Sequence, residues 1–221
     1  MIKPTHQALL LLFILTLTVP ANPRTVIMFD PAGDSHELGR KLAQGYERGA
    51  TLTLAEKLHH ELSQEPGLYP LLSRQPGEQC LPLQAASFAN RLQTNLFVRL
   101  HCYHELTAKP RMYIYYKLHN PLTDLAPRPT VNDRTFTPLS QAHLPNLRLS
   151  IKRAESIKET LSSTDYQQLF DCYGPSGRPL KALTGIQPSA LVIEIGLSGS
   201  TKLESLVQPL KNAILNALLV V

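Results

Sequence analysis

The chain has 221 residues, of which 43% are hydrophobic and 18% are charged, and its formal net charge is +5. A chain of this length and composition suits one domain with a full-sized hydrophobic core. The basic excess is mild and contains no run of Lys and Arg, so the sequence argues against nucleic acid as a partner and is compatible with an anionic polymer such as a cell wall.

Residues 1–21 have the pattern of an export signal. Lys3 is the only charged side chain there, an apolar run from Ala8 to Val19 follows it, and Ala21 is a small residue at a plausible cleavage point. The run is shorter than the roughly 20 residues that a membrane span needs. We predict a cleaved signal peptide, no stable membrane span after cleavage, and a periplasmic or secreted protein. An uncleaved anchor or a buried helix is the alternative.

The rest of the chain, residues 24–221, alternates between strand-length apolar runs and helix-length amphipathic stretches. The expected strands are Thr25–Phe29, Leu68–Ser73, Asn95–His101, Arg111–Lys117 and Ala190–Gly196. The expected helices are Thr51–Leu62, Gln84–Leu92, a helix marked by Ala154, Ile157 and Leu161, and Leu203–Leu218. The expected loops are the proline-rich stretch Pro121 to Pro145 and the turn-rich stretch Asp171 to Pro179. This alternation predicts a single α/β domain with a twisted, mostly parallel or mixed sheet flanked by helices.

Three cysteines follow the predicted signal: Cys80, Cys102 and Cys172. Export would place them in an oxidising compartment, where one pair can bridge and one thiol is left over. The sequence does not say which pair. No Cys-x-x-Cys or Cys/His spacing indicates a structural zinc site.

Two apolar strands carry polar side chains that point to a site. The run Leu96–His101 stops on an imidazole, and Glu194 stands within Leu-Val-Ile-Glu-Ile, where an unpaired carboxylate is costly. Ligands of open α/β sheets gather at the carboxyl ends of the strands. Together with Glu47, before the first helix, these residues suit a zinc hydrolase, which needs imidazole or carboxylate ligands and a base near the bound water.

Each of these residues also has a structural interpretation. His101 could be bonded to a backbone carbonyl, Glu47 could satisfy a helix N-terminus, and Glu194 could form a salt bridge. Their surroundings favour the functional interpretation, because six segments occur in an order known from one family. These segments are Val26–Pro31, Glu47–Ala55, Leu72–Arg74, Phe88–Arg91, Leu96–His101 and Pro188–Leu197. In this order, from about Arg24 to the C-terminus, the chain resembles the zinc-dependent N-acetylmuramoyl-L-alanine amidases of bacterial cell walls.

The resemblance implies an amidase-like fold and a reaction. Glu47 and His101 would be zinc ligands, and Glu194 would assist the attacking water. The substrate would be peptidoglycan, cleaved at the amide between N-acetylmuramic acid and L-alanine. The second hypothesis is a catalytically inactive amidase-like domain that binds peptidoglycan or regulates a cell-wall enzyme, with any protein regulator unknown.

The chain departs from the family at the first zinc ligand. The family has a histidine two residues after the Asp-Pro pair, and the matching residue here is Gly33, which has no side chain to bind a metal. His36 is the predicted third ligand if the loop is reshaped, with Asp34 as the alternative, and His36 is otherwise a surface histidine. Arg99 stands where the family has a small residue, and we expect it to cap a helix or to bind an acidic group. His104 could join the site, although a solvated position fits it better.

Overall fold

The computed structural model describes residues 24–118, 130–131, 134–135 and 137–221. The predicted signal peptide at residues 1–21 lies outside these ranges, as does most of the proline-rich stretch. Within the described part of the chain, no helix combines the length and the apolar character that crossing a bilayer requires.

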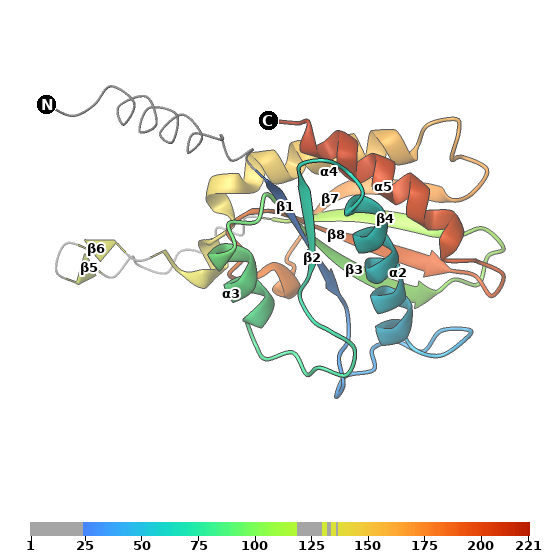
Figure 1. Ribbon diagram of the computed structural model, residues 1–221, viewed down its shortest axis with the longest axis horizontal. Coiled ribbons are helices and arrows are strands. Elements are labelled where there is room, and N and C mark those ends of the chain that lie inside the picture. Colours follow the sequence, from blue (N-terminus) through green and yellow to red (C-terminus); the bar gives the residue numbers. More distant parts are fainter. Residues whose placement is uncertain (1–23, 119–129, 132–133, 136) are drawn as a thin grey trace, which may run out of the picture.

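Six strands form one mixed sheet in the order β2-β1-β3-β8-β4-β7. Their bounds are β1 (Thr25–Pro31), β2 (Leu68–Leu72), β3 (Leu96–His104), β4 (Arg111–Lys117), β7 (Asp171–Arg178) and β8 (Ser189–Leu197). The four strands β2, β1, β3 and β8 are parallel, whereas β4 pairs antiparallel with β8 and parallel with β7. The predicted α/β domain with a mostly parallel or mixed sheet is therefore confirmed. A short hairpin of β5 (Thr130–Val131) and β6 (Arg134–Thr135) is separate from this sheet (Figure 1).

Helices cover both faces of the sheet. Their bounds are α2 (Glu47–Leu62), α3 (Gln84–Arg91), α4 (Leu147–Leu161) and α5 (Glu204–Leu218), with three short 3₁₀ turns η1 (Leu139–Gln141), η2 (Leu144–Asn146) and η3 (Lys181–Leu183). The helices α2, α4 and α5 pack with the sheet around the larger hydrophobic cluster. The helix α3 and the turn η3 pack around a smaller cluster on the other face. In Figure 1, α4 and α5 lie side by side.

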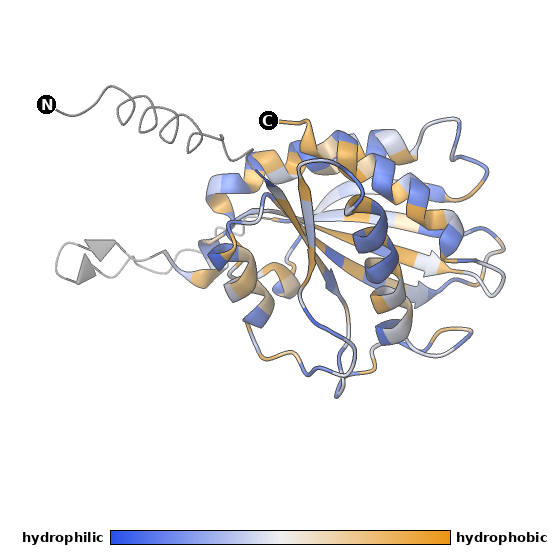
Figure 2. Ribbon diagram, viewed as in Figure 1, coloured by the Kyte–Doolittle hydropathy of each residue, from blue (hydrophilic) through white to orange (hydrophobic). Residues whose placement is uncertain are grey.

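The alternation of side chains along β3 sets up the site. Leu96, Val98 and Leu100 enter the larger cluster, and Phe97 enters the smaller one. Successive residues of a strand point to opposite faces of the sheet, so Arg99, His101 and Tyr103 share the face of Phe97. Hydrophobic colour dominates the central strands in Figure 2. Past the cover of α3, this face therefore presents polar side chains along otherwise apolar strands.

Several boundaries differ from the predictions. The first helix begins at Glu47 instead of Thr51, and β3 continues past His101 to His104. The loop predicted at residues 171–179 is wrong, because this stretch forms strand β7. It lies at the edge of the sheet, where glycine and proline are tolerated because one side of the strand needs no ladder partner.

The disulfide that the sequence allowed is not formed among the described residues, where Cys80, Cys102 and Cys172 are all free thiols. Cys102 lies within the larger hydrophobic cluster, and burial raises the pKa of its thiol. Its side chain therefore behaves as a small apolar group of the core.

Candidate functional site

The fold brings together the three residues that the sequence singles out. His101 on β3 lies directly across from Glu194 on β8 in the parallel register. Glu47 begins α2, and its Oε1 atom lies 2.8 Å from Nδ1 of His101. Residues separated by 54 and more positions thus meet on one face of the sheet. The structure supports the predicted convergence of Glu47, His101 and Glu194.

A fourth residue, Arg40, joins the two carboxylates. It lies in the loop between β1 and α2, and its Nη1 atom donates to Oε1 of Glu194 at 2.7 Å. Its Nη2 and Nε atoms donate to the two carboxylate oxygens of Glu47 at 3.2 Å, and its backbone N–H donates to Glu47 Oε2 at 3.0 Å. Arginine keeps its charge at every physiological pH, so this guanidinium is a permanent cation between two carboxylates.

The hydrogen bonds of His101 indicate which of its ring nitrogens donates and which accepts. Nε of Arg99 donates to Nε2 of His101 at 3.1 Å, so Nε2 must be the acceptor. The proton then resides on Nδ1, which donates to Glu47. The backbone N–H of Cys102 donates to the same carboxylate oxygen at 3.0 Å. Both ring nitrogens of the imidazole are therefore engaged.

Arg99 extends this network toward β1. Its Nη1 atom pairs with Oδ2 of Asp30, and the hydroxyl of Ser73 donates to Oδ1 of the same aspartate at 2.6 Å. Asp30 is buried, which makes such pairing necessary. Of the two roles expected for Arg99, binding an acidic group is the one that the structure supports.

The contacts of Glu47 and Arg40 shift the pKa values of both groups toward their ionised forms. Burial, the largest single influence on Glu47, would raise its pKa, but the hydrogen bonds from His101, Arg40 and Cys102 together lower it far below its ordinary value of 4.5. Burial would lower the pKa of Arg40, and the hydrogen bonds to Glu47 and Glu194 raise it instead. The cluster is thus a charge-paired network in which the guanidinium compensates both acids.

The backbone around Arg40 is shaped for this contact. Gly39 has a φ of +71°, and a Cβ added there would lie 2.8 Å from Oε2 of Glu47. Gly45, in the same loop, has a φ of +76° and open space where its Cβ would be. The loop therefore brings its backbone against the Glu47 carboxylate at Gly39 but not at Gly45.

This difference gives a matched pair of variants. Gly39→Ala and Gly45→Ala both impose a left-handed conformation on alanine, which costs about 1 kcal/mol. Only Gly39→Ala also displaces the Glu47 carboxylate, so its free energy of unfolding should fall further than that of Gly45→Ala. Chemical denaturation of both variants measures the difference. Equal losses would contradict the close approach of Gly39 to Glu47.

The residues of this cluster, as arranged, do not fit a zinc ion. A catalytic zinc needs about three protein ligands with free lone pairs, in addition to the water position. Both oxygens of Glu47 accept hydrogen bonds, both nitrogens of His101 are engaged, and the Arg40 cation lies between Glu47 and Glu194. Among the described residues, no group of three or more His, Cys, Asp or Glu side chains is placed to hold a metal ion.

The loop after β1 does not supply the missing ligand. Gly33 has a φ of +75°, and a Cβ there would lie 2.8 Å from the carbonyl oxygen of Glu37 and 2.9 Å from Cβ of Arg48. His36 is exposed, and its backbone N–H donates to Oδ1 of Asp34 at 2.8 Å. Asp34 itself accepts two backbone hydrogen bonds within the loop and a third from the backbone N–H of Cys80, in the segment before α3. His104 is exposed at the end of β3.

No family model and no curated protein matches the sequence of the chain. Solved structures do match, and several of them are N-acetylmuramoyl-L-alanine amidases. AmiC2 of Nostoc punctiforme is 14% identical with a TM-score of 0.62, covering 88% of this chain and 97% of that chain. The amidase of Clostridium difficile 630 is 18% identical with a TM-score of 0.59, over 89% and 96%.

Ami1 of Mycobacterium smegmatis gives the same result, with 14% identity and a TM-score of 0.58 over 90% of this chain and 97% of that chain. Identities this low establish the fold alone. The chain thus has the fold of an amidase catalytic domain, a six-stranded sheet flanked by four helices. In that fold, its own candidate site holds an arginine between two glutamates.

Proposed function

We propose that this chain is a peptidoglycan-binding domain of amidase fold that does not hydrolyse its ligand. One observation carries the proposal: the guanidinium of Arg40 is held between Glu47 and Glu194 by hydrogen bonds of 2.7–3.2 Å. A fixed cation there repels a divalent metal ion and satisfies the carboxylates that such an ion would need. The wall ligand is proposed from the amidases that share the fold, and the predicted export signal would deliver the protein to the wall.

Hydrolysis of the amide between N-acetylmuramic acid and L-alanine is the second candidate function. It is favoured by the meeting of Glu47, His101 and Glu194, which is the residue set that the amidase resemblance implies. A zinc ion, when bound in such an enzyme, supplies a polarised water. For this chain to work that way, Arg40 would have to leave both glutamates. Its side chain is 44% exposed, so a route to solvent exists.

The two functions separate in one set of measurements on the purified protein. We expect saturable co-sedimentation with purified peptidoglycan sacculi, far less than one zinc per chain by elemental analysis, and no release of stem peptides with or without added zinc. A solved amidase of the same fold serves as the positive control for release. Glu194→Gln should bind sacculi as the wild type does.

Stoichiometric zinc together with peptide release that Glu194→Gln abolishes would establish the hydrolase instead. Absence of saturable binding to sacculi would refute the binding proposal. Metal loss on mutation of His36 would restore that residue as the shifted ligand.

A further inference from the structure

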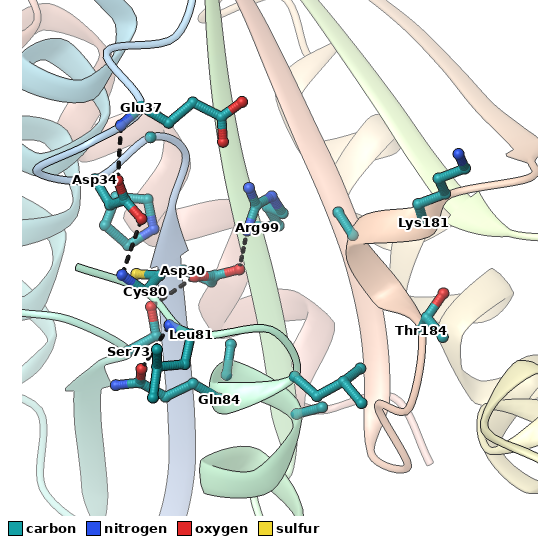
Figure 3. A pocket seen from close by; sticks show the side chains of 16 residues that line it. Asp30, Asp34, Glu37, Ser73, Cys80, Leu81, Gln84, Arg99, Lys181 and Thr184 are labelled. Carbon is teal, nitrogen blue, oxygen red and sulfur yellow. Dashed lines mark hydrogen bonds and ion pairs between the residues drawn. The ribbon is translucent and has the colours of Figure 1, made fainter.

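A pocket of about 230 Å³ opens at the carboxyl end of β1, beside Arg99 in the middle of β3 (Figure 3). Its walls are the loop after β1, the segment that leads into α3, and the turn η3. Arg99 connects the pocket with the Arg40–Glu47–Glu194 cluster, since it lines the pocket and donates to His101, the partner of Glu47. The pocket contains neither Arg40 nor the two glutamates of the cluster.

Two acids of the pocket are already satisfied within the protein. Asp30 pairs with Arg99 and Ser73. Asp34 accepts hydrogen bonds from the backbone N–H groups of His36 and Glu37 at 2.8 Å and from that of Cys80 at 2.9 Å. These backbone hydrogen bonds, first that from Cys80, hold the pKa of Asp34 below its ordinary value. Both aspartates therefore shape the pocket without offering a free charge to a ligand.

Two charges of opposite sign are left over, one on each side of the pocket. Glu37 belongs to the loop after β1 and Lys181 to η3, and both side chains are exposed. Neither makes an ion pair or a side-chain hydrogen bond with any residue that the structure describes. In Figure 3 they lie on opposite sides of Arg99, which is 23% exposed. The pocket thus presents a free anion on one wall and free cationic capacity on the other.

The remaining walls limit what can enter. Leu81 and Leu83 line the pocket with exposed side chains, and the small residues Ala85 and Ala86 line it at the first turn of α3. A volume of about 230 Å³ is below the usual range of about 300–1,000 Å³ for drug-sized ligands. It suits a group of amino-acid size with little side chain, and it is too small to enclose a disaccharide.

We propose that this pocket binds an amino-acid zwitterion. Lys181 holds the carboxylate, and Glu37 holds the ammonium. Charge-assisted hydrogen bonds of this kind are about twice as strong as neutral ones, so recognition requires both charges of the ligand. The inference rests on the proposed function for the source of the ligand: a stem peptide whose diamino acid carries a free ammonium and a free carboxylate on one carbon.

The test uses three small probes on the full protein, titrated by NMR chemical shifts. They are D-alanine, N-acetyl-D-alanine, which lacks the ammonium, and D-alaninamide, which lacks the carboxylate. We expect D-alanine to bind about tenfold more tightly than either blocked form, which corresponds to one lost charge-assisted contact. The shifts should centre on Ala85, Ala86 and Thr184.

Two variants assign the charges. Glu37→Gln should remove the preference for D-alanine over its N-acetyl form while keeping the preference over the amide. Lys181→Gln should do the reverse. Glu56→Gln and Lys202→Gln, which do not line the pocket, are the matched controls and should keep both preferences. Equal binding of all three probes, or no saturable shift with D-alanine, would overturn the proposal.

Failure of this inference and failure of the proposed function look different. If the protein binds sacculi but not D-alanine, it binds the wall through another surface and the assignment of the pocket is wrong. If D-alanine binds with the expected preferences but sacculi do not, the pocket is an amino-acid site and the wall is not its source.

Discussion

Zinc should stabilise the Arg40→Ala variant and should leave the stability of the wild type unchanged. In Arg40→Ala the carboxylates of Glu47 and Glu194 lose their shared cation. The Glu47 side chain, only 4% exposed, loses two hydrogen bonds from the guanidinium and keeps the one from the backbone N–H of residue 40. We expect the free energy of unfolding to fall by about 2 kcal/mol. The loss stays below that of a fully buried pair because Arg40 is 44% exposed and water can enter.

A divalent cation can then take over the charge compensation. At a free zinc concentration of 100 times the dissociation constant, binding to the folded state adds about 2.7 kcal/mol, which offsets the loss. Thermal denaturation with and without zinc measures both effects. Wild type and Arg91→Ala, an exposed control on α3, should show no zinc-dependent shift. Stabilisation of the wild type, or an Arg40→Ala variant that zinc leaves unchanged, would contradict the assignment of Arg40 to a cation position.

Glu47→Ala should be the most destabilising change in the cluster. It leaves Arg40 and His101 without their shared acceptor and leaves the buried backbone N–H of Cys102 unpaired. We expect a loss of about 3 kcal/mol at neutral pH, as for the removal of one partner of a buried ion pair. Chemical denaturation measures it, and Glu56→Ala, an exposed position on the same helix, is the control with an expected change within about 0.5 kcal/mol.

The same carboxylate predicts an acid dependence of stability. The folded-state pKa of Glu47 lies well below its ordinary value of 4.5, so folding favours the ionised form. Its stabilisation is fully present above about pH 4.5 and is lost as the pH falls toward the folded-state pKa. The difference in free energy of unfolding between the wild type and Glu47→Gln should therefore be largest near pH 7 and shrink below pH 4.5. A difference that stays constant from pH 7 to pH 3 would contradict this pairing.

The sequence carried enough information for the sheet and for three of the cluster residues. An apolar run such as Leu96–Val98 predicts a buried strand, with side chains that enter the hydrophobic clusters on both faces of the sheet. A carboxylate inside an apolar strand, as at Glu194, predicts a charged or hydrogen-bonding partner. The start of α2 was harder, because its first turn, Glu47 to Ala50, has only weak apolar periodicity. Strand β7 was missed because glycine and proline normally mark turns, and only its place at the sheet edge explains their presence there.

Arg40 could not be predicted in the same way. It stands in a loop without periodicity, and its partner Glu194 is 154 residues further along the chain. The available signal was indirect: Gly33 left the expected ligand set one side chain short. Because the set of zinc ligands is incomplete, a lysine or arginine side chain is the alternative partner for the two glutamates. The sequence does not indicate which of the chain's 22 lysines and arginines takes this place.

The cation between Glu47 and Glu194 is part of the chain itself, so its presence does not depend on the metal content of the surroundings. An ion that is bound from solution can be withdrawn by a chelator or become scarce when nutrients run low, whereas a side chain cannot. The domain should therefore keep its fold and the arrangement of Arg40, Glu47 and Glu194 during metal starvation.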